Sequence, residues 1–361
     1  MARNRLIIAG GGTGGHVLAG IAIADEWIAT TGGDREDVLF VGASGGIEEK
    51  LVPRAGYRLE LLSVGALNRV SVARKIKTLF QLPVSLFKSA WIVVSFRPKA
   101  VLGVGGYASG PLVLMARLKG FWWGVRTAIL EQNTVPGLTN RILGRVTHRV
   151  FCAFPGTEKG FPKGKPIVTG NPVRSSMKTF PSASRDPFTI FVFGGSQGAA
   201  GINTLVLDAL ASLRDLLPKL RFIHQTGEKD FDRVAEGYRS AEATARVEKF
   251  IHDMPDAYAQ ASLLVCRSGS STLAEVAAVG RAAILIPFPK ASDNHQEKNA
   301  RVFSDAGAAY LLLQERSTGA ELARIFREAI ADPANLARME KVVTAFHRPS
   351  AAKDVVRGLL R

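Results

Sequence analysis

Cysteine is scarce in this chain of 361 residues. Its two cysteines, Cys152 and Cys266, both lie in apolar runs. Two such residues can form neither a zinc cluster nor the disulfide framework of a small secreted scaffold. We therefore expect the protein to work in a reducing compartment.

Long hydrophobic runs are also missing. The longest, such as residues 90–96 and 282–288, are well below the roughly 18 residues that span a bilayer. The apolar run at the N-terminus soon breaks into glycines, so no export signal is expected. The sequence predicts a protein that is not integral to a membrane.

Acidic residues are absent from one long stretch. Residues 61–130 contain no Asp or Glu, although they carry ten Lys and Arg residues. The whole chain has 47 basic and 31 acidic residues, a net charge of +16. This excess predicts an anionic partner, which could be nucleic acid, an acidic membrane surface or a phosphorylated substrate.

The rest of the composition is that of a globular protein. Hydrophobic residues make up 47% and charged residues 22%, with 36 Gly and 17 Pro. This profile excludes collagen, a disordered tail and a disulfide scaffold. At roughly 150 residues per domain, the length predicts two domains.

Short β-rich runs alternate with helix-length amphipathic segments along the whole chain, which is the pattern of parallel α/β sheets. In the first half, strands are expected at residues 5–9, 38–41, 100–102, 127–130 and 149–152. In the second half, they are expected at residues 188–193, 220–224, 247–250, 262–266, 282–286 and 309–313.

A segment rich in Pro, Gly, Ser and Lys, residues 154–187, separates the two halves and has the composition of a linker. Each half opens with a strand followed by a glycine loop. We therefore expect two Rossmann-like domains that face a cleft, with ligands at the C-terminal ends of the strands.

The first glycine loop, Gly10–Gly15, contains a literal G-x-G-x-x-G between a strand and a helix. A dinucleotide site would also need an acidic residue at the end of the second strand, which instead ends in Gly-Ala-Ser-Gly. A Walker A motif would need Gly-Lys-Ser/Thr, but Gly15 is followed by His16. Both a nicotinamide enzyme and an NTPase are therefore disfavoured.

Two further loops join strands to helices, at Gly194–Gly198 and at residues 266–275. A single such loop could be an ordinary turn, but three favour a ligand that carries phosphate. Ser196 could donate its hydroxyl to a diphosphate, and Glu275 could accept the two hydroxyls of a ribose. His16 could act as a general base, since imidazole titrates near neutral pH, or could simply bond to backbone.

Metal ligands are not evident, because no Asp-x-Asp motif follows any predicted strand. Helix N-termini and backbone amides would then have to neutralise the charge of a diphosphate. The sequence predicts no divalent-metal site.

The acid-free stretch also has apolar residues at helical spacing from Val72 to Trp91, and Pro83 should bend or interrupt that helix. It continues into the aromatic segment Lys119–Arg126. Apolar and aromatic groups beside cations suit an anionic bilayer surface, although a core-facing helix with a basic face would show the same periodicity. Nucleic acid is disfavoured, since no helix-turn-helix, RRM or zinc signature occurs.

A series of motifs resembles the MurG family of glycosyltransferases in order and spacing. They are GGTGGH (Gly11–His16), GGYASGP (Gly105–Pro111), EQN (Glu131–Asn133), GLTNR (Gly137–Arg141), AFPG (Ala153–Gly156), GNPVR (Gly170–Arg174), GGSQGA (Gly194–Ala199), CRSG (Cys266–Gly269) and DNHQEKNA (Asp293–Ala300).

This resemblance implies a GT-B fold and an inverting glycosyltransferase of bacterial cell-wall synthesis. Such an enzyme moves N-acetylglucosamine from UDP-N-acetylglucosamine to lipid I, the undecaprenyl-diphosphate-linked muramoyl pentapeptide, and forms lipid II. It works without a cofactor, peripherally on the cytoplasmic face of the cell membrane, and other cell-wall enzymes are possible partners. Residues 1–165 would face acceptor and membrane, residues 166–344 would bind the UDP-sugar, and residues 345–361 would pack back on the first domain.

The resemblance also assigns site residues, with His16 as the candidate base. In the second domain, Gly195 and Ser196 would bind donor phosphate, Ile251 would pack at the uracil and Glu275 would hold the ribose. The remaining substrate-binding positions are Thr13, Gly14, Gly15, Tyr107, Asn133, Arg174, Ser270, Ser271, Thr272, Leu273, Ala274 and Gln296.

Two positions depart from the family pattern. Leu130 stands where the family usually has His before Glu-Gln-Asn, so an imidazole there is not required in this chain. Val17 replaces the usual Pro after His16, which affects only the turn. A related enzyme acting on another lipid such as diacylglycerol, and a UDP-sugar binder without turnover, remain as alternatives at this level.

Overall fold

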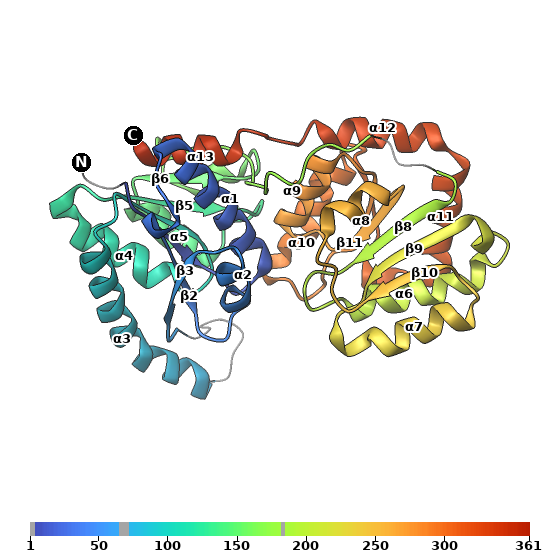
Figure 1. Cartoon of the computed structure of the whole chain (residues 1–361), viewed down its shortest axis with the longest axis horizontal. Helices are drawn as coiled ribbons and strands as arrows, with labels where there is room; N and C mark the ends of the chain where they lie inside the picture. The colour runs from blue at the N-terminus through green and yellow to red at the C-terminus, as the bar shows by residue number, and fades with distance from the viewer. Residues whose placement is uncertain (1–3, 65–71, 182–184) are drawn as a thin grey trace. The chain divides into compact units, whose positions relative to one another are not determined.

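The computed structural model of the chain describes residues 4–64, 72–181 and 185–361; within the helix that begins at Val72, side chains are described from residue 81 onward. The chain forms two compact units. The first comprises Met1–Arg174 and Arg348–Arg361, and the second comprises Ser175–His347. Each unit is a parallel sheet covered by helices (Figure 1).

The first unit contains a seven-stranded sheet in the order β3-β2-β1-β4-β5-β6-β7. Its strands are β1 (Leu6–Gly10), β2 (Val38–Ala43), β3 (Arg58–Leu62), β4 (Ala100–Gly105), β5 (Arg126–Glu131), β6 (Arg149–Cys152) and β7 (Pro166–Val168). Its helices are α1 (Gly14–Thr31), α2 (Glu48–Arg54), α3 (Val72–Phe96), α4 (Ser109–Lys119), α5 (Leu138–Val146) and α13 (Ala351–Leu360), with 3-10 turns at Arg35–Asp37, Gly120–Trp123 and Thr157–Gly160.

The second unit contains a six-stranded sheet in the order β10-β9-β8-β11-β12-β13. Its strands are β8 (Phe188–Phe193), β9 (Leu220–Gln225), β10 (Ala245–Glu248), β11 (Leu263–Cys266), β12 (Ala283–Leu285) and β13 (Ala309–Leu311). Its helices are α6 (Ala200–Leu210), α7 (Phe231–Ser240), α8 (Met254–Gln260), α9 (Ser270–Val279), α10 (His295–Ser304), α11 (Gly319–Ala331) and α12 (Pro333–Thr344), with 3-10 turns at Ala211–Leu213, Leu217–Lys219, Glu228–Asp230, Ser292–Asn294 and Gln314–Arg316.

The predicted α/β class with two parallel sheets is confirmed: every pairing between the named strands is parallel. The central strands β1 and β8 are buried along their whole length, as continuous apolar runs require when helices cover both faces of a sheet. Because all strands run in one direction, the loops after their C-terminal ends gather at one edge of each sheet. The glycine loops lie at these edges.

The first unit extends beyond the predicted boundary at residue 165 and, as the family resemblance implied, includes the C-terminal helix. Strand β7 pairs with β6, so residues 166–174 belong with the first sheet rather than beginning the second domain. Helix α13 packs against α1, and Val355, Val356 and Leu359 join the core formed by β1 and α1 (Figure 1). Helix α1, which carries His16, therefore packs against the C-terminal helix of the chain.

Helix α3 continues through Pro83, so the predicted interruption is wrong. A proline removes one backbone donor, but a helix survives that loss where its neighbours are packed. Here α3 lies beside α4, and Ile92, Val93 and Phe96 are buried in the core of the first unit. Packing of the second half of α3 outweighs the missing hydrogen bond.

Candidate active site

Two glycine loops of the first unit meet backbone to backbone. The amide of Gly11, after β1, donates to the carbonyl of Gly105, at the end of β4, over 3.2 Å. A Cβ on Gly10 would overlap that carbonyl, and a Cβ on Gly106 would lie 2.5 Å from the carbonyl oxygen of Gly11. Gly10, Gly105 and Gly106 all have positive φ. Only glycine allows this approach.

His16 lies in the first turn of α1, directly against these loops. Thr13 caps the helix and accepts a hydrogen bond from the His16 amide. The ring Nδ1 lies 3.1 Å from the carbonyl oxygen of Gly11. A carbonyl can only accept, so Nδ1 carries a proton in this bond, and in the neutral ring Nε2 then holds the lone pair. This tautomer is the one that a general base needs.

The Nε2 edge of His16 lies over Gly105, where a Cβ would come within 2.7 Å of Nε2 and where φ is +108°. We expect Gly105→Ala to displace the imidazole and to lower turnover about tenfold, while the affinity for UDP stays unchanged. Steady-state kinetics and calorimetry measure the two quantities. Gly124→Ala is the control, since Gly124 has φ of +66° and open space around its Cβ position. Equal losses in both variants would show general strain instead.

Glu48, the first residue of α2, is a buried residue of this site that the sequence analysis missed. Its carboxylate accepts hydrogen bonds from the amides of Gly12 and Ala43, each over 2.9 Å. A Cβ on Gly11, Gly42 or Gly46 would meet the same carboxylate. The Gly12 amide therefore already donates its hydrogen bond to a carboxylate of the chain itself. Glu48 is far from the loop in sequence, so no local motif indicates it.

The loop after β5 is organised by Glu131. One carboxylate oxygen accepts from the backbone and side-chain amides of Asn133, and the other accepts from Gly137 and Asn140. The predicted substrate residue Asn133 is therefore held in place by a buried carboxylate. Leu130 points into the core, in agreement with its apolar character. Tyr107 is half exposed in the loop after β4, and Arg174 is the last residue of the first unit before the chain enters the second.

In the second unit, the loop after β8 presents Gly195 and Ser196 at the surface. The Gly198 amide donates to the Gly195 carbonyl over 2.9 Å, which closes a turn around Ser196. A Cβ on Gly198 would overlap the carbonyl of Thr226. The glycines therefore bring this loop against the end of β9.

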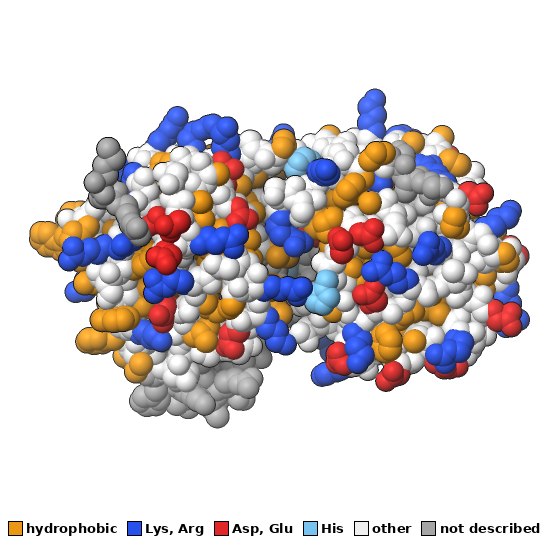
Figure 2. All heavy atoms as spheres, in the orientation of Figure 1, with side chains coloured by type: hydrophobic (Ala, Val, Ile, Leu, Met, Phe, Trp, Pro, Cys, Tyr) orange, Lys and Arg blue, Asp and Glu red, His pale blue; other side chains and the backbone are white. Residues whose placement is uncertain are grey.

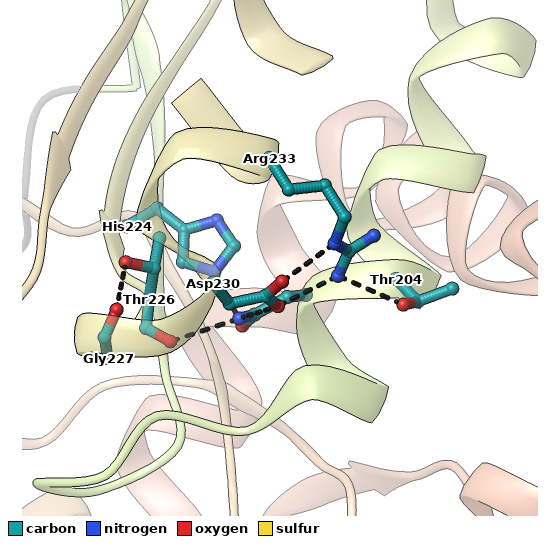
Figure 3. A network of polar contacts seen from close by, with 7 residues as sticks. Thr204, His224, Thr226, Gly227, Asp230 and Arg233 are labelled. Atoms are coloured by element: carbon teal, nitrogen blue, oxygen red, sulfur yellow. Dashed lines mark hydrogen bonds and ion pairs between the residues drawn. The ribbon is translucent and has the colours of Figure 1, made fainter. Parts of the chain in front are cut away.

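A polar network fixes the end of β9 (Figure 3). The fully buried His224 bonds through Nε2 to Asn203 and through Nδ1 to Tyr238. Asn203 in turn donates to the carbonyl of Thr226 and to Asp230, which Arg233 holds from the other side. Burial lowers the pKa of His224 to about 3, so this imidazole is neutral at physiological pH and serves the structure.

Helix α9 carries six of the predicted residues, Ser270, Ser271, Thr272, Leu273, Ala274 and Glu275. The side chain of Leu273 is completely buried, so it can contact no ligand. Glu275 is the sixth residue of this helix, and its carboxylate accepts a hydrogen bond from the buried Tyr258 hydroxyl over 3.1 Å. This hydrogen bond holds the carboxylate in a fixed orientation.

Two other predicted residues hold backbone segments together. The Gln296 side chain accepts from the Phe288 amide over 2.9 Å, while its carbonyl accepts from Ser268. The amide of Ile251 donates to the side chain of Gln225. The Ile251 side chain is buried, so a uracil would meet this segment mainly through its backbone.

Arg267 supplies a buried positive charge at the end of β11. Its guanidinium donates to the carbonyls of Ile286 and Pro287 and to the side chain of Gln314. Burial lowers its pKa to about 10, which still leaves it charged at neutral pH. The sequence analysis attributed charge neutralisation to amides and helix ends alone and missed this cation within the CRSG motif.

Across residues 4–64, 72–181 and 185–361, no three His, Cys, Asp or Glu side chains are grouped so that they could hold a metal ion. Within the same ranges, no helix is both long enough and apolar enough to cross a bilayer.

Comparison with known proteins identifies the family. Residues 6–152 match the family model of the glycosyltransferase family 28 N-terminal domain, and residues 189–355 match that of its C-terminal domain. The chain is 46% identical over 360 residues to the UDP-N-acetylglucosamine–N-acetylmuramyl-(pentapeptide) pyrophosphoryl-undecaprenol N-acetylglucosamine transferase of Geobacter sp. (strain M21), covering 99% of this chain and 95% of that protein. The protein of the same name from Myxococcus xanthus (strain DK1622) is 45% identical over 354 residues, with 97% and 91% covered. The chain belongs to the MurG family.

A solved structure supports the fold of this MurG-family chain. The crystal structure of Acinetobacter baumannii MurG matches with a TM-score of 0.78 and 30% identity, and 99% of each chain is covered. The GT-B fold predicted from the motifs is thereby confirmed. The MurG-family chain is a UDP-N-acetylglucosamine-dependent glycosyltransferase.

Proposed function

We propose that this chain transfers N-acetylglucosamine from UDP-N-acetylglucosamine to lipid I and so produces lipid II for peptidoglycan synthesis. The observation that carries the proposal is full-length identity of 43–46% to relatives that all bear the name of this transferase. The glycine loops, His16 and Glu275, whose side chains are oriented by hydrogen bonds, would provide the groups that such a reaction needs.

In the proposed reaction, His16 acts on the acceptor. Its Nε2 lone pair takes the proton from the attacking muramoyl hydroxyl as the new glycosidic C–O bond forms at the anomeric carbon. The bond from that carbon to the diphosphate oxygen breaks, and UDP leaves with the electron pair. Attack on the face opposite the leaving group inverts the anomeric centre and yields the β-1,4 bond.

The second unit would hold the donor. Glu275 would accept hydrogen bonds from the ribose hydroxyls, and the segment at Ile251 would meet the uracil. Ser196 with the Gly195 turn, and Ser270 with Ser271 and Thr272 at the N-terminus of α9, would receive the diphosphate. A fixed cation at Arg267 and the amides at the start of α9 would stabilise the charge that develops on UDP.

The other proposed substrate contacts complete this assignment. Gln296 would contact the donor sugar, and Leu273 and Ala274 would contribute only backbone. The proposed substrate-binding residues of the first unit are Thr13, Gly14, Gly15, Asn133 and Arg174. Tyr107 would lie on the acceptor side.

The decisive assay is transfer of labelled N-acetylglucosamine from its UDP donor to a short-chain lipid I analogue, in the presence of chelator and beside a diacylglycerol acceptor. Transfer to the lipid I analogue alone supports the proposal. Transfer to diacylglycerol instead would assign a different lipid acceptor, and donor binding without transfer to either would leave only a binder.

We also propose that the chain docks peripherally on the cytoplasmic face of the cell membrane, where a polyprenyl-linked acceptor lies. The support is an exposed apolar surface on α3 and on the end of α4, formed by Val84, Phe87, Trp91, Leu118, Phe121, Trp122 and Trp123, which we call the α3–α4 apolar surface. Phe87 and Trp122 are each 82% exposed. Figure 2 shows hydrophobic side chains beside Lys and Arg along the edge that carries these helices in Figure 1.

Charge completes the argument for docking. Lys88 lies on α3 and Arg117 and Lys119 lie on α4, while Arg126 begins β5; all four belong to the stretch without acids. Aromatic groups enter the interface while cations meet anionic headgroups, and salt screens the second contribution within about 8 Å at physiological ionic strength.

We expect the double variant Phe121→Ser, Trp122→Ser to bind anionic phosphatidylglycerol vesicles at least about 30-fold more weakly, because burying even one large aromatic side chain contributes about 2 kcal/mol. Vesicle co-sedimentation measures the partition, and turnover of a water-soluble acceptor analogue should not change. Ile167→Ser, which alters an exposed side chain on β7, is the control. Unaltered sedimentation of the double variant would rule out this surface.

A further inference from the structure

Gln225 occupies a special place in the second sheet. It is the last residue of β9, the strand between β8 and β10. In register, it pairs with Phe193 on one side and with Glu248 on the other. The chain continues from Phe193 into the phosphate loop, Gly194–Gly198, and from β10 towards Ile251. A side chain at this position can therefore reach both neighbouring loops.

Both ends of the Gln225 amide are used. Its Nε2 donates to the carbonyl oxygen of Gly195 over 2.8 Å, and its Oε1 accepts from the amide of Ile251 over 2.9 Å. The two partners also settle which end is nitrogen, since a carbonyl only accepts and a backbone amide only donates. The side chain is 3% exposed, so water does not substitute readily for either bond.

The carbonyl that receives Gln225 is the one that shapes the phosphate loop. Gly195 also accepts from the Gly198 amide, and this bond closes the turn that presents Ser196. Gln225 itself stands on a fixed backbone, because the amides of Thr226 and Gly227 donate to the carbonyls of Glu248 and Lys249, and Asn203 holds the Thr226 carbonyl (Figure 3). The amide thus links two segments that local hydrogen bonds alone leave separate.

We propose that Gln225 is a positioning residue that couples the phosphate loop to the uracil-side segment at Ile251, so that the two ends of a nucleoside diphosphate are bound in one fixed spacing. The identity of the ligand rests on the proposed function. The link itself rests on the two hydrogen bonds. The binding free energy contributed by the uracil and the binding free energy contributed by the phosphates then both depend on the Gln225 side chain.

The test uses the full chain with uridine and with UDP, whose affinities are measured by calorimetry or by NMR titration. Gln225→Glu keeps an acceptor for the Ile251 amide but sets a carboxylate against the Gly195 carbonyl. We expect it to bind uridine as the wild type does and UDP about tenfold more weakly. Gln225→Met is uncharged, has similar length and loses both bonds. Gln225→Met should lower the affinity for both uridine and UDP. Because this variant carries no charge, such a loss would exclude repulsion of the diphosphate as the cause of weaker UDP binding.

A matched control is Gln260→Glu, which makes the same chemical change at a residue whose amide donates to Asp256. It should leave both affinities unchanged. In kinetics, Gln225→Glu should raise the KM for the donor with little change in kcat, whereas a loss of folded protein would lower the active fraction and leave KM alone.

The outcomes separate the two proposals. If the wild type binds UDP and both Gln225 variants bind it equally well, the positioning role is wrong while the proposed function stands. Parallel losses for uridine and UDP in Gln225→Glu would also overturn it, because the bond to Ile251 is kept in that variant. If the wild type itself fails to bind UDP, both proposals fail.

Discussion

Replacing His16 with alanine is expected to lower turnover at least 100-fold while the affinity for UDP stays within twofold of the wild type. A positioned general base contributes about 10²–10⁴ in rate, and the ring of His16 is oriented by the Gly11 carbonyl so that Nε2 can accept a proton. The donor residues proposed above for uracil and ribose all belong to the second unit, so the loss should fall on kcat.

The measurement pairs single-turnover transfer with UDP titration. His148→Ala is the matched control, because His148 is the other histidine of the first unit and lies before β6, at the opposite edge of the sheet from the glycine loops. His148→Ala should retain most of the turnover. Normal turnover in His16→Ala would remove this imidazole as the base, and a loss of UDP binding would reassign it to the donor.

Replacing Glu275 with alanine is expected to raise the KM for the donor about 100-fold. A hydrogen bond to a charged group contributes about 1.5–3 kcal/mol, and a ribose offers two hydroxyls to this carboxylate. Tyr258 already orients one oxygen of the Glu275 carboxylate, so the side chain loses little conformational entropy when the donor binds.

A 2′-deoxy donor makes this experiment specific. The wild type should discriminate against the deoxy donor, and Glu275→Ala should not, since the variant has lost the partner of that hydroxyl. Glu236→Ala, at an exposed carboxylate on α7, provides the control. If Glu275→Ala still discriminates, the ribose is bound elsewhere.

The sequence predicted the strands that are apolar on both faces and missed β3 and β7, the two edge strands of the first sheet, which are not. The expected range 188–193 coincides with β8, which is buried throughout. β3 was missed because Arg58 and Glu60 interrupt its apolar residues, and at the edge of a sheet a strand needs no buried second face. β10, another edge strand, begins and ends two residues before its predicted range.

For the site, local patterns sufficed where the chemistry is local. A strand, a glycine loop and a helix are adjacent in sequence, so the settings of His16 and Ser196 could be anticipated. Glu48 and Gln225 could not, because each reaches its partners across the sheet and neither stands in a recognisable motif. Burial could not be anticipated either: the resemblance assigned Ile251 and Leu273 to substrate binding, yet their side chains face the core.

The packing of α13 on α1 has a consequence for biosynthesis. Val355, Val356 and Leu359 complete the core behind β1, and a Cβ on Gly358 would come within 2.6 Å of the ring of Phe151, so the fit is close. During translation, the segment that carries His16 emerges first, but the helix that supports it is made only after the entire second unit. Folding of the first unit is therefore completed only after the residues of the whole second unit have been synthesised.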